Sequence, residues 1–128
     1  MLFRSESTRI GTRIASLVDG PMLGYDLNYV LDKQPSELAL AATLSEPSSG
    51  RVLEIWTTEP GIQFYSGNFL DGIEGKGGAV YRKHGGFCLE TQAFPDAVNQ
   101  AGKPGWPNVI LRPGEQYRHV MVHRFYAE

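Results

Sequence analysis

Short apolar or alternating runs closed by glycine or proline constrain the fold of this chain more than any other feature of its sequence. The 128 residues include 15 glycines and 8 prolines, almost a fifth of the chain, and these are spread along it rather than gathered in one linker. Glycine and proline interrupt regular structure, and runs of about four to eight residues between such interruptions are typical of strands. The sequence therefore predicts an all-β fold with long connections and little helix.

The clearest local prediction is a hairpin in the first half of the chain. Residues 37–44 alternate, which predicts one shared face for Leu38, Leu40, Ala42 and Leu44. A Pro-Ser-Ser-Gly turn at 47–50 leads into residues 51–58, whose side chains suit a pleated surface, so we expect an antiparallel pair. The other expected strands are 25–31, 62–65, 86–92 and 116–126, and the expected helix is 10–17.

Two long connections, 67–78 and 94–107, flank Glu90 in the sequence. Loops longer than about 12 residues within a compact domain are usually functional or disordered. The chain has no internal repeat, charge run or low-complexity tract that would mark a boundary. We therefore predict a single domain over residues 1–128, which is an ordinary domain size.

Composition excludes several classes of partner. The net charge is −2 with scattered basic residues, which argues against nucleic acid. No run approaches the ~20 apolar residues of a membrane helix, and residues 1–6 lack the pattern of a secretory signal, so we expect a cytoplasmic protein without a membrane partner. The single cysteine, Cys88, excludes an internal disulfide, and no Cys/His spacing suggests zinc. A small, uncharged partner is the remaining expectation.

Glu90 is the strongest single candidate for chemistry. It lies between apolar residues in the expected strand 86–92, where a carboxylate is exposed, ion-paired or functionally tuned, because an unpaired buried charge is costly. The alternation of side chains along the expected strand, taken alone, favours a Glu90 that is exposed or ion-paired.

Two further candidates are Gln63 and Asp26. Gln63 lies in residues 58–72, where amides, hydroxyls and aromatic rings interleave as a carbohydrate site requires. The alternative is a strand whose Gln63 points to solvent. Asp26 begins the strand 25–31, and its alternative role is to cap a turn.

Four motifs occur together, and jointly they are far more specific than any one of them. They are GYDxNYVL at 24–31, TEPGxQFYxGN at 58–68, GxCLExQxxPD at 86–96 and LRPGExY at 111–117. Their order and approximate separations resemble the aldose 1-epimerase family over essentially the whole chain. The stretch TRIGxRI at 8–14 is also similar to the segment that precedes the Tyr-Asp motif in that family.

The resemblance implies an antiparallel β-sandwich, part of a β-supersandwich. It also implies a free aldohexose such as galactose or glucose as substrate, with no metal and no organic cofactor. Position by position, it implies that Glu90 is the catalytic base and that Asp26 and Gln63 bind sugar hydroxyls. Leu27 departs from the histidine often found after the aspartate, which we interpret as variation near the site.

The family's general acid is a histidine well before the Tyr-Asp motif, and we expect this chain to begin too late to contain it. His84 is an alternative acid, whereas His119 and His123 fit ordinary positions in the last strand. The interpretation is a truncated mutarotase, weak or inactive alone, that self-associates through sheet edges which a longer chain would cover. A working enzyme that gains its acid elsewhere, an inactive fragment and a non-catalytic carbohydrate-binding module remain alternatives.

Overall fold

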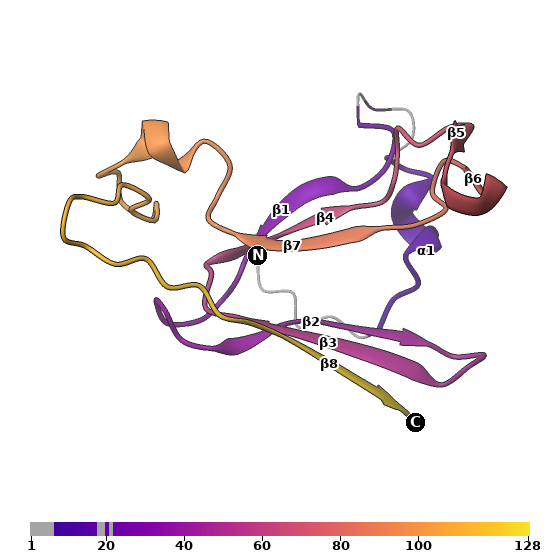
Figure 1. Cartoon of the computed structure of the whole chain (residues 1–128), viewed down its shortest axis with the longest axis horizontal. Helices are drawn as coiled ribbons and strands as arrows, with labels where there is room; N and C mark the ends of the chain where they lie inside the picture. The colour runs from indigo at the N-terminus through magenta and orange to yellow at the C-terminus, as the bar shows by residue number, and fades with distance from the viewer. Residues whose placement is uncertain (1–6, 18–19, 21) are drawn as a thin grey trace. The chain divides into compact units, whose positions relative to one another are not determined.

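The prediction of an all-β fold is confirmed by the computed structural model, which describes residues 7–17, 20 and 22–128 (Figure 1). The expectation about residues 1–6 lies outside that part. The one α-helix among the described residues is α1, Gly11–Ile14, within the expected 10–17. The strands are β1 Asp26–Val30, β2 Ala39–Glu46, β3 Arg51–Thr57, β4 Gly61–Tyr65, β5 Ile73–Glu74, β6 Val80–Tyr81, β7 Cys88–Gln92 and β8 Met121–Ala127. Two short 3₁₀ helices are η1 Lys76–Gly78 and η2 Ala97–Gln100.

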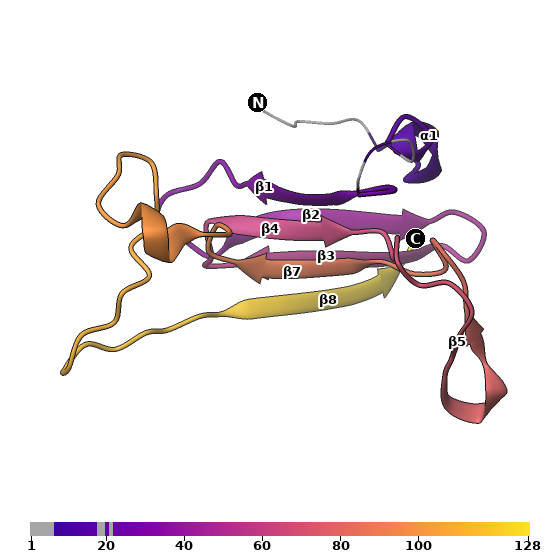
Figure 2. The same cartoon turned by 90° about the horizontal axis from the view of Figure 1, so that it is seen from above.

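The strands form three sheets, ordered β1-β4-β7, β2-β3-β8 and β5-β6 (Figures 1 and 2). The chain also separates into two compact units. The first comprises Met1–Leu27 and Gln63–Glu90, and the second comprises Asn28–Ile62 and Thr91–Glu128. The three candidate residues all belong to the first unit.

The predicted hairpin is confirmed, with β2 antiparallel to β3 and β8 antiparallel to the other edge of β3. The prediction of one shared face was wrong in one respect. A β-bulge interrupts the pairing between Leu40 and Ala42, so Leu40 is opposite Trp56 while Ala42 is opposite Ile55. An extra residue reverses the alternation that follows it, which leaves Leu40 exposed and Leu44 half-buried.

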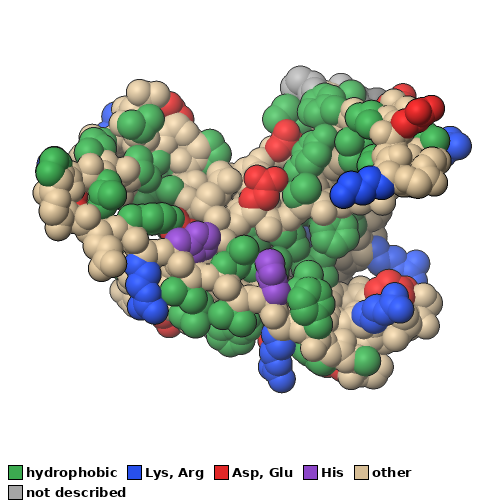
Figure 3. All heavy atoms as spheres, viewed as in Figure 1, with side chains coloured by type: hydrophobic (Ala, Val, Ile, Leu, Met, Phe, Trp, Pro, Cys, Tyr) green, Lys and Arg blue, Asp and Glu red, His purple; other side chains and the backbone are tan. Residues whose placement is uncertain are grey.

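The buried apolar side chains within the described residues centre on β3. Val52 and Ile55 are buried on opposite faces of this middle strand, three positions apart, and Ile62 and Ala97 are also buried, all in the second unit. A middle strand has both of its edges paired, so its inward side chains are covered most completely. Many other hydrophobic side chains reach the surface (Figure 3), among them Phe125 on β8, which is 74% exposed.

Two expectations about the second half of the chain need correction. Residues 67–78, expected as a loop, include β5 and η1 at the start of the small hairpin that β6 completes. The last strand begins at Met121 rather than at residue 116, so His119 precedes it. Within the described part of the chain, no helix combines the length and hydropathy needed to cross a bilayer.

Candidate functional site

Asp26 and Gln63 meet through their side chains on neighbouring strands. The Gln63 Nε2 donates a hydrogen bond to Asp26 Oδ1 over 2.7 Å, joining β1 to β4. A carboxylate only accepts hydrogen bonds, so the amide must present its nitrogen to Asp26 and direct its oxygen elsewhere. Both side chains are half-buried. This contact excludes a Gln63 that simply points into solvent.

The start of β1 is held in place from behind by the loop after β4. The backbone N–H of Tyr25 donates to Ser66 Oγ over 3.0 Å, and Asn68 Nδ2 donates to the Tyr25 carbonyl over 2.8 Å. Gly24 permits this approach, because its φ is +151° and a Cβ there would overlap the Asn68 Oδ1. The GYD and GN motifs therefore fix the position from which Asp26 reaches Gln63.

The second polar atom of Gln63 has no partner. Its Oε1 is buried and accepts no hydrogen bond from any residue that the structure describes. Buried polar atoms are nearly always satisfied, and an unsatisfied acceptor costs about 1–3 kcal/mol. An acceptor held in place by Asp26 and left unpaired is suited to a donor from outside, such as a hydroxyl group.

Glu90 lies on the same face of the sheet as Gln63. On one face, the rings of Tyr25 and Phe64 lie 4.9 Å apart and those of Phe64 and Phe87 lie 6.2 Å apart. Side chains alternate along strands, so Gln63, one residue before Phe64, and Glu90, three residues after Phe87, point to the opposite face. Glu90 is exposed there and makes no ion pair within the described residues. The structure thus brings all three candidates to one sheet.

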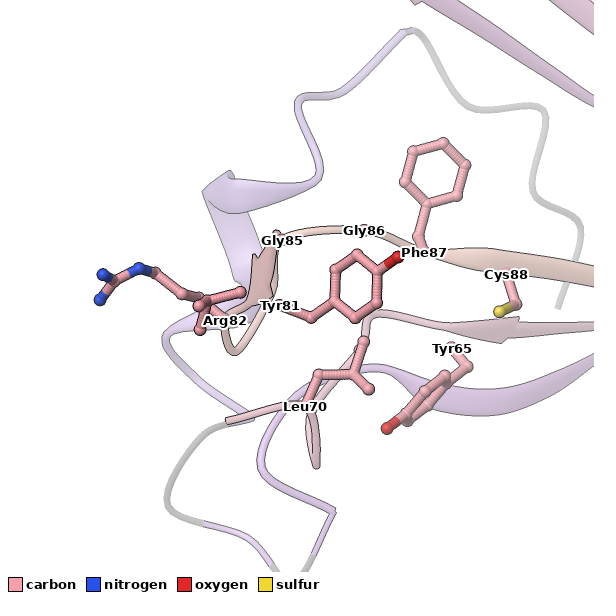
Figure 4. Close-up of a pocket in the computed structure, with 10 residues that line it drawn as sticks. Tyr65, Leu70, Tyr81, Arg82, Gly85, Gly86, Phe87 and Cys88 are labelled. Carbon is pink, nitrogen blue, oxygen red and sulfur yellow. The ribbon is translucent and has the colours of Figure 1, made fainter. Parts of the chain in front are cut away.

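An apolar cavity of about 570 Å³ lies at one end of this face (Figure 4). Tyr65, two residues after Gln63, and Cys88, two residues before Glu90, line the cavity. Gln63 and Glu90 themselves do not line it. The phenol oxygen of Tyr65 accepts a hydrogen bond from the Phe69 N–H over 3.0 Å, which fixes the ring. Phe87 also lines the cavity, and Figure 4 shows its ring directed away from Tyr65. The cavity size is ordinary for a small-molecule site.

The histidines have other partners in the structure. The Nε2 of His84 lies 3.0 Å from the Leu23 carbonyl, and since a carbonyl only accepts, that nitrogen must carry a proton. His119 Nε2 lies between two threonine hydroxyls in the second unit. Among the described residues, no group of three His, Cys, Asp or Glu side chains could hold a metal ion.

Asn28 is a site-like residue that the sequence reasoning did not single out. Its Nδ2 is buried without a partner among the described residues, and it lies two positions after Asp26 on β1. The available signal was the spacing of two polar residues along a strand, which places both on one face.

Comparison with known proteins agrees with these motifs and this fold. The aldose 1-epimerase family model matches residues 2–124, and the chain belongs to that family. It is 54% identical to human galactose mutarotase over 110 residues, covering 85% of this chain and 31% of the relative. It is 36% identical to the aldose 1-epimerase of Escherichia coli over 107 residues, covering 82% of this chain and 30% of that protein.

A solved structure confirms the fold assignment. The GalM/aldose epimerase homologue from C. elegans matches with a TM-score of 0.70 at 29% identity, over 88% of this chain and 33% of that one. The chain therefore spans about a third of the length of the relatives it matches.

Proposed function

We propose that this chain carries the catalytic base and two sugar-binding side chains of an aldose 1-epimerase that interconverts the α and β anomers of a free hexose such as galactose. Asp26 and Gln63 hold hydroxyl groups of the sugar, and Glu90 accepts the proton of the anomeric hydroxyl. The observation that carries the proposal is the unpaired, buried Oε1 of Gln63, oriented by Asp26 on the face that bears Glu90.

The chemistry needs no more from these three residues than orientation and one proton transfer. Ring opening removes a proton from the anomeric hydroxyl and delivers another to the ring oxygen. Rotation about C1–C2 and reclosure then give the other anomer. A positioned carboxylate typically contributes 10²–10⁴-fold to such a step, and fixing the sugar at hydrogen-bond distance adds to this.

The proton donor for the ring oxygen is, in this proposal, supplied from outside the 128 residues. His84 shares the unit that carries Glu90, but its Nε2 is already bound to the Leu23 carbonyl. The relatives are about three times as long as this chain, which leaves room in them for such a donor. We accordingly expect the chain alone to bind hexose and to accelerate mutarotation little. We also expect a cytoplasmic location and no nucleic-acid partner, from composition.

Polarimetry of freshly dissolved α-D-galactose, combined with a binding titration, tests the proposal. We expect saturable galactose binding that is weakened at least tenfold in Gln63→Met, the loss expected when one buried hydrogen bond is missing. Gln34→Met, at an exposed position before β2, is the control and should bind normally. Absence of galactose binding in a folded sample would contradict the proposal.

The same experiment separates the second candidate, a non-catalytic carbohydrate-binding module. The unpaired Gln63 oxygen favours binding whether or not turnover follows. Mutarotation faster than the buffer control, abolished by Glu90→Gln with binding retained, identifies a base. Galactose binding, together with a mutarotation rate that is the same with and without the Glu90 carboxylate, identifies the module.

A further inference from the structure

A histidine outside the candidate site joins two strands through threonine hydroxyls. His119 Nε2 lies 3.0 Å from Thr91 Oγ1 and 3.3 Å from Thr57 Oγ1. The Thr57 side chain is 0% exposed and Thr91 is 9% exposed, while the His119 side chain is half-buried. All three residues belong to the second unit, where Thr57 ends β3 and Thr91 lies in β7. The ring therefore connects the sheet β2-β3-β8 to strand β7.

Counting donors assigns the proton of this contact. The Thr91 hydroxyl donates to Met121 Sδ over 3.1 Å, so its single hydrogen is used and its oxygen accepts. Thr57 Oγ1 accepts the Glu59 N–H over 3.0 Å. The remaining donor for Thr91 is the His119 Nε2–H, which is present in the neutral Nε2 tautomer and in the imidazolium. The contact is thus a hydrogen bond from His119 to Thr91.

Thr91 directly follows Glu90 in β7. Successive side chains of a strand point to opposite faces, so the Thr91 hydroxyl is bound behind the sheet while Glu90 projects from its front. We propose that His119 is a positioning residue, which fixes β7 at Thr91 and thereby sets where the Glu90 carboxylate stands. The proposal rests on the role of Glu90 described above and extends it. A carboxylate displaced by about 1 Å can cost about 10²-fold in rate.

Nuclear magnetic resonance on the full chain tests the proposal without requiring activity. In His119→Leu we expect the Glu90 carboxyl carbon and the Thr91 amide to shift, because the hydrogen bond is lost. Glutamine carries an N–H donor at a similar reach, so His119→Gln should restore most of both resonances. The matched control is His123→Leu, whose ring lies on β8 against Phe125 at 6.3 Å. It should leave both resonances unchanged.

A second variant covers the case in which His119→Leu does not fold. Thr91→Val keeps the side-chain shape and removes the hydroxyl, so it should move the Glu90 resonance in the same direction. The imidazole ¹⁵N spectrum of the unaltered chain should show the His119 Nε2–H form at neutral pH. An Nδ1–H form, equal effects of leucine and glutamine at 119, or an unmoved Glu90 resonance in Thr91→Val would each overturn the proposal.

A galactose titration of the same variants measures the effect of His119 on sugar affinity. We expect His119→Leu to weaken binding about tenfold and His119→Gln to restore it, as for one hydrogen bond. If the unaltered chain binds no galactose, the proposed function fails while the resonances still decide the role of His119. If binding is present and His119→Leu leaves it unchanged, the positioning role is overturned and the proposed function stands.

Discussion

Gly24 shows how one residue without a side chain permits the polar pair beside it. Its φ of +151° is a conformation that L side chains rarely adopt, and an added Cβ would overlap the Asn68 side chain. We predict that Gly24→Ala lowers the free energy of unfolding by about 1–3 kcal/mol, because backbone strain and a displaced Asn68 add together. Urea denaturation measures this loss. The control is Gly72→Ala, where φ is also positive but no atom lies within 4 Å, so only strain remains. Equal losses at the two positions would contradict the role given to Asn68.

Gln63 and Asp26 were identified as candidate residues from the sequence, whereas other features of the site were not. The family resemblance implies that both bind sugar hydroxyls, which stays a prediction, and the structure shows that their side chains are in contact. The unpaired state of Asn28 and the contacts of His119 were not predicted. His119 lies 28 positions after Thr91 and 62 positions after Thr57 in the sequence. No local sequence pattern specifies contacts over such separations.

At the scale of elements, β3 and the bulge in β2 give a paired prediction. Ile55 is 2% exposed, whereas Leu40 is 46% exposed because the bulge turns it outward. We predict a loss of about 2–5 kcal/mol for Ile55→Ala, which removes buried methyl groups and leaves a cavity. Leu40→Ala should cost less than about 1 kcal/mol, as is usual for surface positions. Equal losses in thermal unfolding would contradict the exposed position of Leu40.

The same bulge explains what the sequence could not specify about strands. The positions of the strands could be predicted from glycine and proline interruptions and from alternation. A bulge places one extra residue in one of two paired strands, and that residue cannot be recognised in the sequence until the partner strand is known. The β5-β6 hairpin was missed because each strand has two residues, too few for a periodic pattern.

Tyr117 gives a prediction for the segment before β8. Its phenol donates a hydrogen bond to the buried Glu59 carboxylate over 2.7 Å, which together with burial raises the pKa of Tyr117 to about 12. A raised pKa stabilises the fold below the ordinary value of 10.0, and this contribution is lost as pH rises from there through about 12. The hydrogen bond to Glu54 also raises the pKa of Tyr126. Ultraviolet titration should therefore show late tyrosine ionisation that includes a step near 12, and Tyr117→Phe should remove the step near 12 and flatten the alkaline fall in stability. Persistence of the step near 12 in Tyr117→Phe would assign it to another tyrosine.

At the scale of the whole molecule, exposed sheet edges should drive association. β8 is an edge strand of its sheet, and Phe125 and Val122 on it are 74% and 42% exposed. Unpaired edges with apolar side chains recruit further strands. We predict concentration-dependent self-association in sedimentation velocity, reduced by Phe125→Lys, with Arg51→Lys on β3 as a control that leaves it unchanged. A monodisperse monomer at all concentrations would contradict this.

The most direct test of the shared sugar site is a galactose titration of the isotope-labelled chain. The side-chain amide of Gln63, the carboxyl carbons of Asp26 and Glu90, and their backbone amides should shift together with a single dissociation constant. Control titration with myo-inositol, which has hydroxyls but no anomeric carbon, should leave Glu90 the least affected of the three. Galactose-induced shifts confined to other residues, or shifts at Glu90 that saturate independently of Gln63, would show that these side chains do not form one site.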